Sequence, residues 1–136
     1  MFDEHYEKGM VNKEIYQMIL NKGYSREVIT ADASEPKSIE ELKRYGLYRI
    51  RSARKGKDSV MNGIQFIHQF KLVIHPRCTN FKLELENYTW KKDKMTNEYI
   101  NTPIDTFNHG IDGFRYSLEE VMRNMKKKIR ATKRIY

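Results

Sequence analysis

Short apolar runs alternate with amphipathic segments in the first half of the chain, and this alternation limits the folds open to it. Residues 12–22 carry apolar side chains at helical spacing and stop at Gly23, so they predict a helix. Residues 27–32 form a shorter apolar run that predicts a buried strand. A capping box at 38–41 predicts the start of a second helix, and a second strand is predicted at 47–52. Strands that alternate with helices indicate an α/β domain.

The second half of the chain has a less regular pattern. A helix is predicted over 59–69, and residues 71–74 resemble a strand. Residues 81–86 alternate apolar and charged side chains, which suits either a strand or a short amphipathic helix. From Asn108 a helix is predicted to run into a basic C-terminal tail at 123–136.

Composition narrows the class of protein. A chain of 136 residues fits one domain, and 39% hydrophobic with 12% aromatic residues is enough for a core, which excludes a wholly disordered chain. The run at 72–74 is among the longest apolar runs and is too short to span a membrane, and the first residues lack a secretory signal. The single cysteine, Cys78, excludes a disulfide framework. We therefore expect one soluble intracellular domain over 1–136, with no membrane partner.

The charge balance favours a polyanionic partner. Lys and Arg total 26 against 18 Asp and Glu, a net charge of +8, which favours nucleic acid ahead of an anionic membrane. The excess lies in the C-terminal tail and around the strand at 47–52 with the loop after it. A solvated helix face and a solubilising tail explain the same charges equally well. The candidate nucleic-acid contacts are Arg51, Arg54, Lys55, Lys57, Lys126, Lys127 and Lys128.

Three acidic side chains are candidates for chemistry. Asp32 closes an apolar strand before a turn, where α/β sheets often carry metal-binding or catalytic groups, although Asp32 and Ser34 could instead cap that turn. Asp112 lies among apolar residues, and His109 precedes it by one helical turn on the same face. The helix dipole would also favour an acid there without any catalytic role. Glu35 is a weaker candidate, because a Glu in a turn usually faces water.

Acids on separate elements become important together when they share a hard cation. Mg²⁺ and Mn²⁺ prefer oxygen ligands, and two ions about 4 Å apart stabilise the attacking and leaving oxygens of phosphodiester cleavage. Basic residues nearby would hold the phosphate backbone. The sequence leaves open whether Asp32 and Asp112 meet. It contains neither a Gly-rich phosphate-binding loop nor a nucleophile elbow.

Four segments resemble, in order, motifs of the nuclease domain of tailed-phage large terminases. Residues 30–42 are similar to the segment around the second catalytic Asp of that family. Residues 108–116 are similar to its third motif, which usually has Ala where Gly113 stands. The basic segment 55–60 and the spacing of Cys, Leu, Tyr and Trp over 78–90 also resemble the family. The resemblance covers nearly the whole chain.

This resemblance implies a ribonuclease H-like fold, with a mixed sheet flanked by helices, and a two-metal endonuclease that cuts concatemeric viral DNA during packaging. Carried over residue by residue, Asp32 and Asp112 would bind Mg²⁺ or Mn²⁺, and His109 would join them as a catalytic residue, orienting Asp112 or a water. The implied partners are double-stranded DNA and, in a full protein, an ATPase domain, the small terminase subunit and the portal. The implied location is the cytoplasm of a bacterial host cell.

One departure from the family accompanies the resemblance. Family members carry their first catalytic Asp on a strand that precedes a segment similar to 2–6, and here Asp3 and Glu4 are not placed to substitute for it. The expected fold is therefore incomplete at the N-terminus, without that strand or the ATPase domain. The strand at 27–32 would then be an unpaired edge that recruits a second copy in a homo-oligomer. A non-catalytic DNA-binding or packaging-assembly fragment remains the alternative function, and a basic RNA-binding protein is a third.

Overall fold

The structure, a computed structural model, describes residues 1–56 and 58–133, and side chains up to residue 129. Its residues group into two compact units that alternate along the chain. We call them the hairpin unit, Met1–Tyr6 with Lys71–Phe114, and the parallel unit, Glu7–Phe70 with the described residues from Arg115 onward. The names refer to the strands that each unit contains. That residues 1–136 form a single, partial domain remains a prediction.

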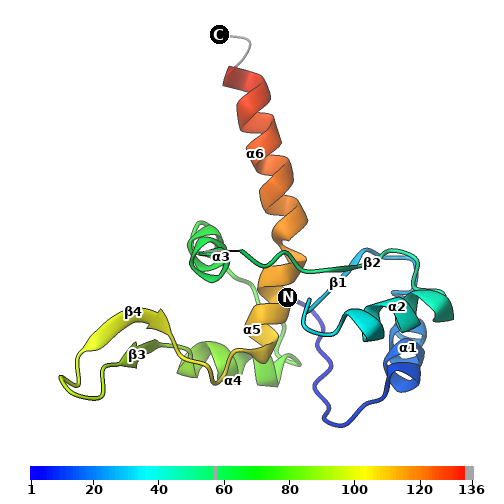
Figure 1. Ribbon diagram of the computed structural model, residues 1–136, viewed down its shortest axis with the longest axis horizontal. Helices are drawn as coiled ribbons and strands as arrows, with labels where there is room; N and C mark the ends of the chain where they lie inside the picture. The colour runs from blue at the N-terminus through cyan, green and yellow to red at the C-terminus, as the bar shows by residue number, and fades with distance from the viewer. Residues whose placement is uncertain (57, 134–136) are drawn as a thin grey trace. The chain divides into compact units, whose positions relative to one another are not determined.

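A β-α-β arrangement forms the centre of the parallel unit (Figure 1). β1 (Ile29–Ala31) pairs in parallel with β2 (Ile50–Ser52), and α2 (Pro36–Tyr45) lies between them in the chain. The register places Ile29 opposite Ile50, so both strands direct apolar side chains toward α2 and its core. Both predicted strands and the α/β pattern are therefore confirmed.

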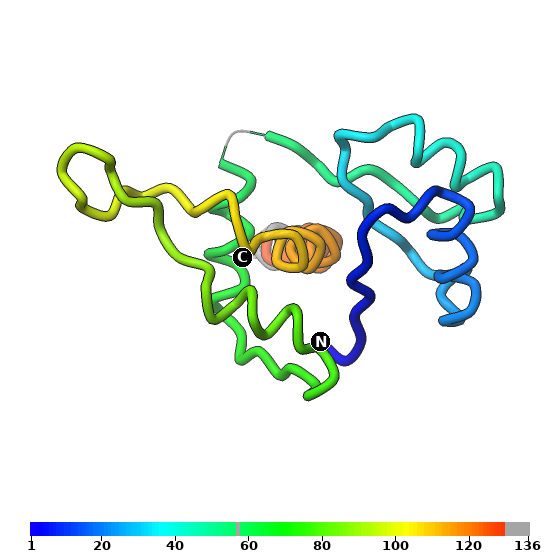
Figure 2. Tube along the Cα trace, turned by 90° about the horizontal axis from the view of Figure 1, so that it is seen from below, coloured from blue at the N-terminus to red at the C-terminus, as the bar shows by residue number. Residues whose placement is uncertain are grey.

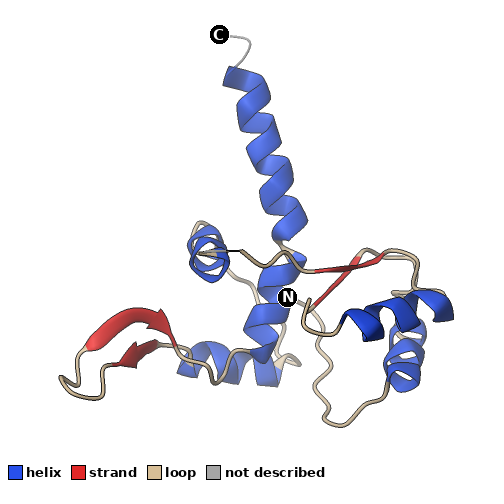
Figure 3. Cartoon of the chain, viewed as in Figure 1, coloured by secondary structure: helices blue, strands red, loops and turns tan. Residues whose placement is uncertain are grey.

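An apolar cluster supports this strand pair. Its buried members are Ile39, Leu42, Leu47 and Ile50. α1 (Asn12–Asn21) packs Ile15, Tyr16 and Ile19 against the same cluster, as the predicted helical spacing requires. Figure 3 shows α1 and α2 together on one side of the two short strands.

The start of α2 differs from the prediction. The helix begins at Pro36, with Glu35 as its N-cap, so Ser38 lies in the first turn and does not open a capping box. Proline suits the first helical position because its fixed φ matches the helix and its missing N–H would have no partner there. The helix ends at Gly46, whose φ of 121° favours a residue without a Cβ.

Two further helices complete the parallel unit. α3 (Ser59–Ile67) buries Gly63, Phe66 and Ile67. A Cβ added to Gly63 would overlap Cδ of Arg115, so the glycine makes room for that buried side chain. α6 (Glu119–Lys133) carries the basic segment, which is therefore helical through Lys133. None of the described helices has the length and apolar character needed to cross a bilayer.

The hairpin unit contains α4 (Thr79–Asn87) and an antiparallel hairpin of β3 (Trp90–Lys92) and β4 (Tyr99–Pro103). Figures 1 and 2 both show the hairpin projecting away from α4. α5 (His109–Ser117) follows, and the helix predicted from Asn108 is divided near Leu118, where α5 ends and α6 begins. A small core holds this unit together, with Cys78, Phe81 and Ile111 as its buried members.

The strand predicted at 71–74 does not form. The segment belongs to neither sheet, and Val73 is 72% exposed. Its partner is the chain terminus: the Met1 ammonium donates to the carbonyl of Val73 at 2.7 Å, and the N–H of His75 donates to the carbonyl of Met1 at 2.9 Å. Two such bonds fix the terminus without extending into a ladder.

Candidate metal and nucleic-acid site

Asp32 lies directly after β1, at the carboxyl end of the parallel strand pair. Its Oδ1 accepts a hydrogen bond from the N–H of Ser34 at 2.9 Å and pairs with Nζ of Lys55 at 3.1 Å. The Ser34 N–H, followed by the Lys55 ammonium, lowers the pKa of Asp32 below its ordinary value. Asp32 therefore caps the turn, and its side chain is also 51% exposed and charged at neutral pH.

A basic cleft of about 380 Å³ opens beside Lys55 within the parallel unit. Its cationic lining residues are Arg54, Lys55, Arg115, Arg123, Lys126 and Lys127. Among the described lining residues there is one acid, Glu119. A concave surface lined by one sign of charge concentrates the opposite sign, so this cleft suits a phosphate backbone.

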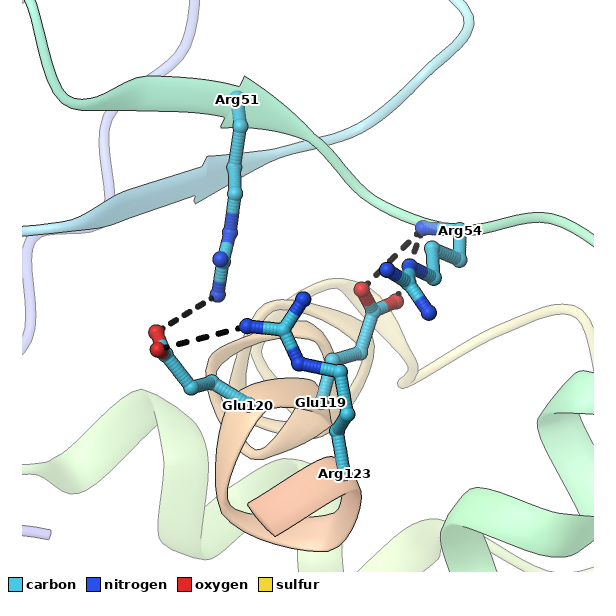
Figure 4. Close-up of polar contacts among 5 residues, drawn as sticks. All are labelled: Arg51, Arg54, Glu119, Glu120 and Arg123. Carbon is cyan, nitrogen blue, oxygen red and sulfur yellow. Dashed lines mark hydrogen bonds and ion pairs between the residues drawn. The ribbon is translucent and has the colours of Figure 1, made fainter. Parts of the chain in front are cut away.

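Two glutamates at the start of α6 hold the cleft in place (Figure 4). Arg51, on β2, donates to Oε2 of Glu120 at 3.0 Å, and Arg123 pairs with Oε1 of Glu120 at 3.5 Å. The backbone N–H of Arg54 donates to both carboxylate oxygens of Glu119, at 3.0 and 3.2 Å. These contacts tie β2 and the loop after it to α6, and they compensate the charge of Arg51.

The residues predicted to contact nucleic acid therefore do not all line the cleft. Arg54, Lys55, Lys126 and Lys127 line the cleft. Arg51 holds β2 against α6, and Lys128 is exposed on α6 outside the cleft lining. Lys57 lies outside the described residues. Sequence reasoning did not single out Glu119 and Glu120, because a Glu pair at a helix start is also typical of a solvated helix.

His109 and Asp112 lie in the first turn of α5, in the hairpin unit. His109 is exposed and Asp112 is half-buried, and the two residues are one helical turn apart. Asp32 belongs to the parallel unit, so the distance between Asp32 and Asp112 stays a prediction. Within each unit, the described residues bring together no group of three or more His, Cys, Asp or Glu that could hold a metal ion.

A buried acid caps the helix that carries Asp112. Glu84, on α4, is 4% exposed; its Oε2 accepts a hydrogen bond from the N–H of Ile111 at 3.0 Å, and its Oε1 accepts one from the hydroxyl of Tyr6 at 3.2 Å. Sequence reasoning missed Glu84 because a strand over 81–86 would place it on a polar face. As a helix, the same residues put Glu84 beside Phe81 on the buried face.

A second acid caps α4 itself. Oε1 of Glu4 accepts hydrogen bonds from the backbone N–H and the side-chain amide of Asn80 at 2.9 and 3.0 Å, and Oε2 accepts one from the N–H of Phe81 at 2.9 Å. Burial alone would raise the pKa of Glu4, but these donors lower it below its ordinary value. Glu4 is thus a helix cap of α4.

Comparison with known protein families gives a match over most of the chain. The model of the family described as "Terminase RNAseH like domain" matches residues 1–120. The chain belongs to this family. We refer to it below as the terminase domain.

Two large terminase subunits are similar to the terminase domain. The large subunit of the terminase of Bacillus phage SPP1 is 37% identical over 128 residues, which cover 92% of this chain and 29% of that protein. The PBSX phage terminase large subunit of Bacillus subtilis strain 168 is 29% identical over 122 residues, covering 86% and 27%. The terminase domain thus spans less than a third of the length of these curated relatives.

A solved structure is similar in three dimensions. The crystal structure of the nuclease domain of the SPP1 large terminase, solved with bound Mn, matches with a TM-score of 0.74 and 35% identity. The match covers 81% of this chain and 63% of that chain. The ribonuclease H-like fold is therefore confirmed, and with it the resemblance found in the sequence.

Proposed function

We propose that the terminase domain is a metal-dependent endonuclease domain that cleaves double-stranded DNA by two-metal phosphodiester hydrolysis. The observation that carries this proposal is the position of Asp32. It is a charged, half-exposed carboxylate at the carboxyl end of a parallel strand pair, and Lys55 links it to a cleft lined by cations. Ligands and catalytic groups commonly gather at that end of α/β sheets.

Each of the two candidate acids offers donors that suit a hard divalent cation. Asp32 and Asp112 offer carboxylate oxygens, the ligands that Mg²⁺ and Mn²⁺ prefer, and the lowered pKa keeps Asp32 deprotonated. When bound, such ions stabilise the charge on the phosphodiester oxygens and make a coordinated water more acidic. His109, in the same helical turn as Asp112, would orient Asp112 or a water. The solved relative with bound Mn supports this proposal by similarity.

The remaining residues would bind and hold the DNA. Arg54, Lys126 and Lys127 line one cleft and would contact successive phosphates without reading the sequence. Lys55, which here pairs with Asp32, would contact a phosphate if Asp32 held a cation. In a full protein we expect an ATPase domain, the small terminase subunit and the portal as further partners, in the bacterial cytoplasm.

The direct test is nicking of supercoiled plasmid by the 136-residue chain in Mg²⁺ and in Mn²⁺. Nicking should require the metal and should be lost in Asp32→Asn and Asp112→Asn, and it should be reduced in His109→Ala. Glu40→Gln, which changes an acid that is 58% exposed on α2, is the matched control and should keep full activity. Equal nicking by Asp32→Asn and the unmodified chain would refute the assignment.

A DNA-binding or packaging-assembly module without catalysis is the second candidate. The observation in its favour is that the basic cleft is formed within the parallel unit alone and so depends on none of the residues of the hairpin unit. This alternative predicts salt-dependent DNA binding with no nicking in either metal. The plasmid assay and a binding titration on the same preparation separate the two functions.

A further inference from the structure

We propose that Glu84 is a positioning residue for Asp112. Its buried carboxylate fixes the first turn of α5 and thereby sets the direction in which the Asp112 side chain points. This inference rests on the proposed function, because the need for a fixed direction comes from metal binding by Asp112.

The contact between Glu84 and α5 is direct. The first N–H groups of a helix have no partner within the helix, and the N–H of Ile111 is one of them. Oε2 of Glu84 accepts that N–H at 3.0 Å in a buried setting, next to the positive end of the helix dipole. Ile111 immediately precedes Asp112, so this bond fixes the backbone at the residue that carries the candidate ligand.

The other oxygen of Glu84 is held as well. The hydroxyl of Tyr6 donates to Oε1 at 3.2 Å. Burial and the charge of Glu84 raise the pKa of Tyr6, so the hydroxyl keeps its proton and remains a donor. Glu4 caps α4, the helix that carries Glu84, with backbone donors at 2.9 Å. Both ends of the contact are therefore fixed: α4 by the N-terminal segment, and α5 by Glu84.

Gly110 and Gly113, the two glycines of the segment 108–116, differ in the space around them. A Cβ added to Gly110 would lie 3.1 Å from Oε2 of Glu84 and 3.3 Å from Cδ2 of Phe81, closer than ordinary van der Waals contact. A Cβ added to Gly113 would meet nothing within 4 Å, which explains how this chain tolerates Gly where the family motif usually has Ala. A methyl group at Gly110 would therefore press on Glu84 and Phe81, which would have to move by a few tenths of an ångström, whereas a methyl group at Gly113 would press on nothing.

This difference provides a matched pair of variants. Gly110→Ala and Gly113→Ala both add one methyl group to α5 and both favour the helix by a similar amount. Only Gly110→Ala pushes against the Glu84 carboxylate. Glu84→Gln tests the charge itself, and Glu86→Ala, an exposed acid on the same helix, is its control.

The experiment is NMR on the ¹⁵N-labelled 136-residue chain, with Mn²⁺ alone as the probe. Broadening of resonances around Asp112 gives the Mn²⁺ dissociation constant, and amide exchange at Ile111 reports the capping bond. Glu84→Gln and Gly110→Ala should weaken Mn²⁺ binding by about 10- to 100-fold, as loss of supporting partners does in metal sites, and should speed exchange at Ile111. Gly113→Ala and Glu86→Ala should match the unmodified chain in both measurements.

The outcomes separate the inference from the proposed function. Faster exchange at Ile111 with unchanged Mn²⁺ affinity would overturn the positioning role and leave the metal assignment intact. If Mn²⁺ causes no broadening around Asp112, or if the broadening persists in Asp112→Asn, the metal assignment is overturned. In that case the Asp112 χ1 couplings decide the positioning role: couplings that do not change in Glu84→Gln and Gly110→Ala overturn it. If Glu84→Gln fails to fold, Tyr6→Phe removes one of the two bonds to Glu84 and replaces it in the comparison.

Discussion

In the parallel unit the candidate acid stands exposed at the end of a strand, whereas in the hairpin unit it lies on a helix that a buried acid caps. Asp32 is oriented by Ser34, two residues away, and by Lys55. Asp112 follows Ile111, whose N–H is bound by Glu84 from 27 positions earlier in the chain. One acid is thus placed by local turn chemistry, and the other depends on a contact between two helices.

The cations of the two units also differ. In the parallel unit, Lys126 and Lys127 line a cleft. In the hairpin unit, Lys91 pairs with Asp105 at 2.6 Å, and Nζ of Lys92 lies 5.0 Å from the centre of the Tyr99 ring. In the parallel unit these cations share one cleft, as the proposed DNA binding requires, whereas Lys91 and Lys92 contact neighbouring side chains of the hairpin unit.

The largest expected effects are losses of unfolding free energy caused by substitutions in the two cores. Phe81→Ala, in the hairpin unit, should cost about 3–5 kcal/mol of unfolding free energy, and Leu47→Ala, in the parallel unit, about 2–5 kcal/mol, because both side chains are fully buried. Hydrogen exchange read by mass spectrometry should show faster opening mainly in the unit that carries the substitution. If either variant speeds hydrogen exchange equally in both units, the two units unfold together. The contrast between two separately stabilised units would then be wrong.

The second largest effect is expected on DNA binding, when lysines of the cleft are replaced. The double variant Lys126→Ala/Lys127→Ala should reduce the log–log salt slope of double-stranded DNA binding by about 2, since each phosphate contact contributes about 0.9. Fluorescence anisotropy at several salt concentrations measures this slope. Lys91→Ala/Lys92→Ala removes the same charge from the hairpin and should leave the slope nearly unchanged. Equal losses in the two double variants would mean that net charge, not the cleft, determines binding.

The acids of the two units should share one pH response. The lowered pKa values of Asp32 and Glu4 mean that each contributes stability above its ordinary pKa, 3.8 and 4.5, and loses it as the pH falls through the lowered value. Lys55→Met should raise the pKa of Asp32 only part of the way, because the N–H of Ser34, the larger cause, remains. Carboxyl-detected NMR titration measures both residues. An Asp32 that titrates at 3.8 or above in the unmodified chain would contradict the geometry.

The smallest effect concerns association. Among the described strands, β1 is paired on one side only, by β2. We expect this edge to support weak self-association, visible by light scattering at micromolar concentration. Val28→Lys, beside β1, should reduce association by placing a charge at the edge, while Val73→Lys, at an exposed position outside both sheets, should not. A monomer at every concentration would show that another part of the chain protects the edge.

Local patterns determined most of the parallel unit. The short apolar runs became β1 and β2, and the helical spacing of 12–22 became α1, because each pattern concerns neighbours within a few residues. The position of Asp32 at a strand end followed from the same reasoning. The errors there were small: α2 began at Pro36 rather than Ser38, since proline at the first helical position outweighed the capping box.

Tertiary packing decided the hairpin unit. Residues 81–86 suited strand or helix equally, and only packing of Phe81 against Ile111 and Phe114 selects the helix that buries Glu84. The apolar run at 71–74 had the composition of a strand, but among the described residues it joins no sheet and bonds to the chain terminus instead. The sequence by itself determined which residues are acidic, basic and apolar, and where short elements form. The tertiary structure decided which of them meet, because the Glu4, Glu84 and Glu119 contacts join positions far apart in the chain, and no local pattern encodes such distances.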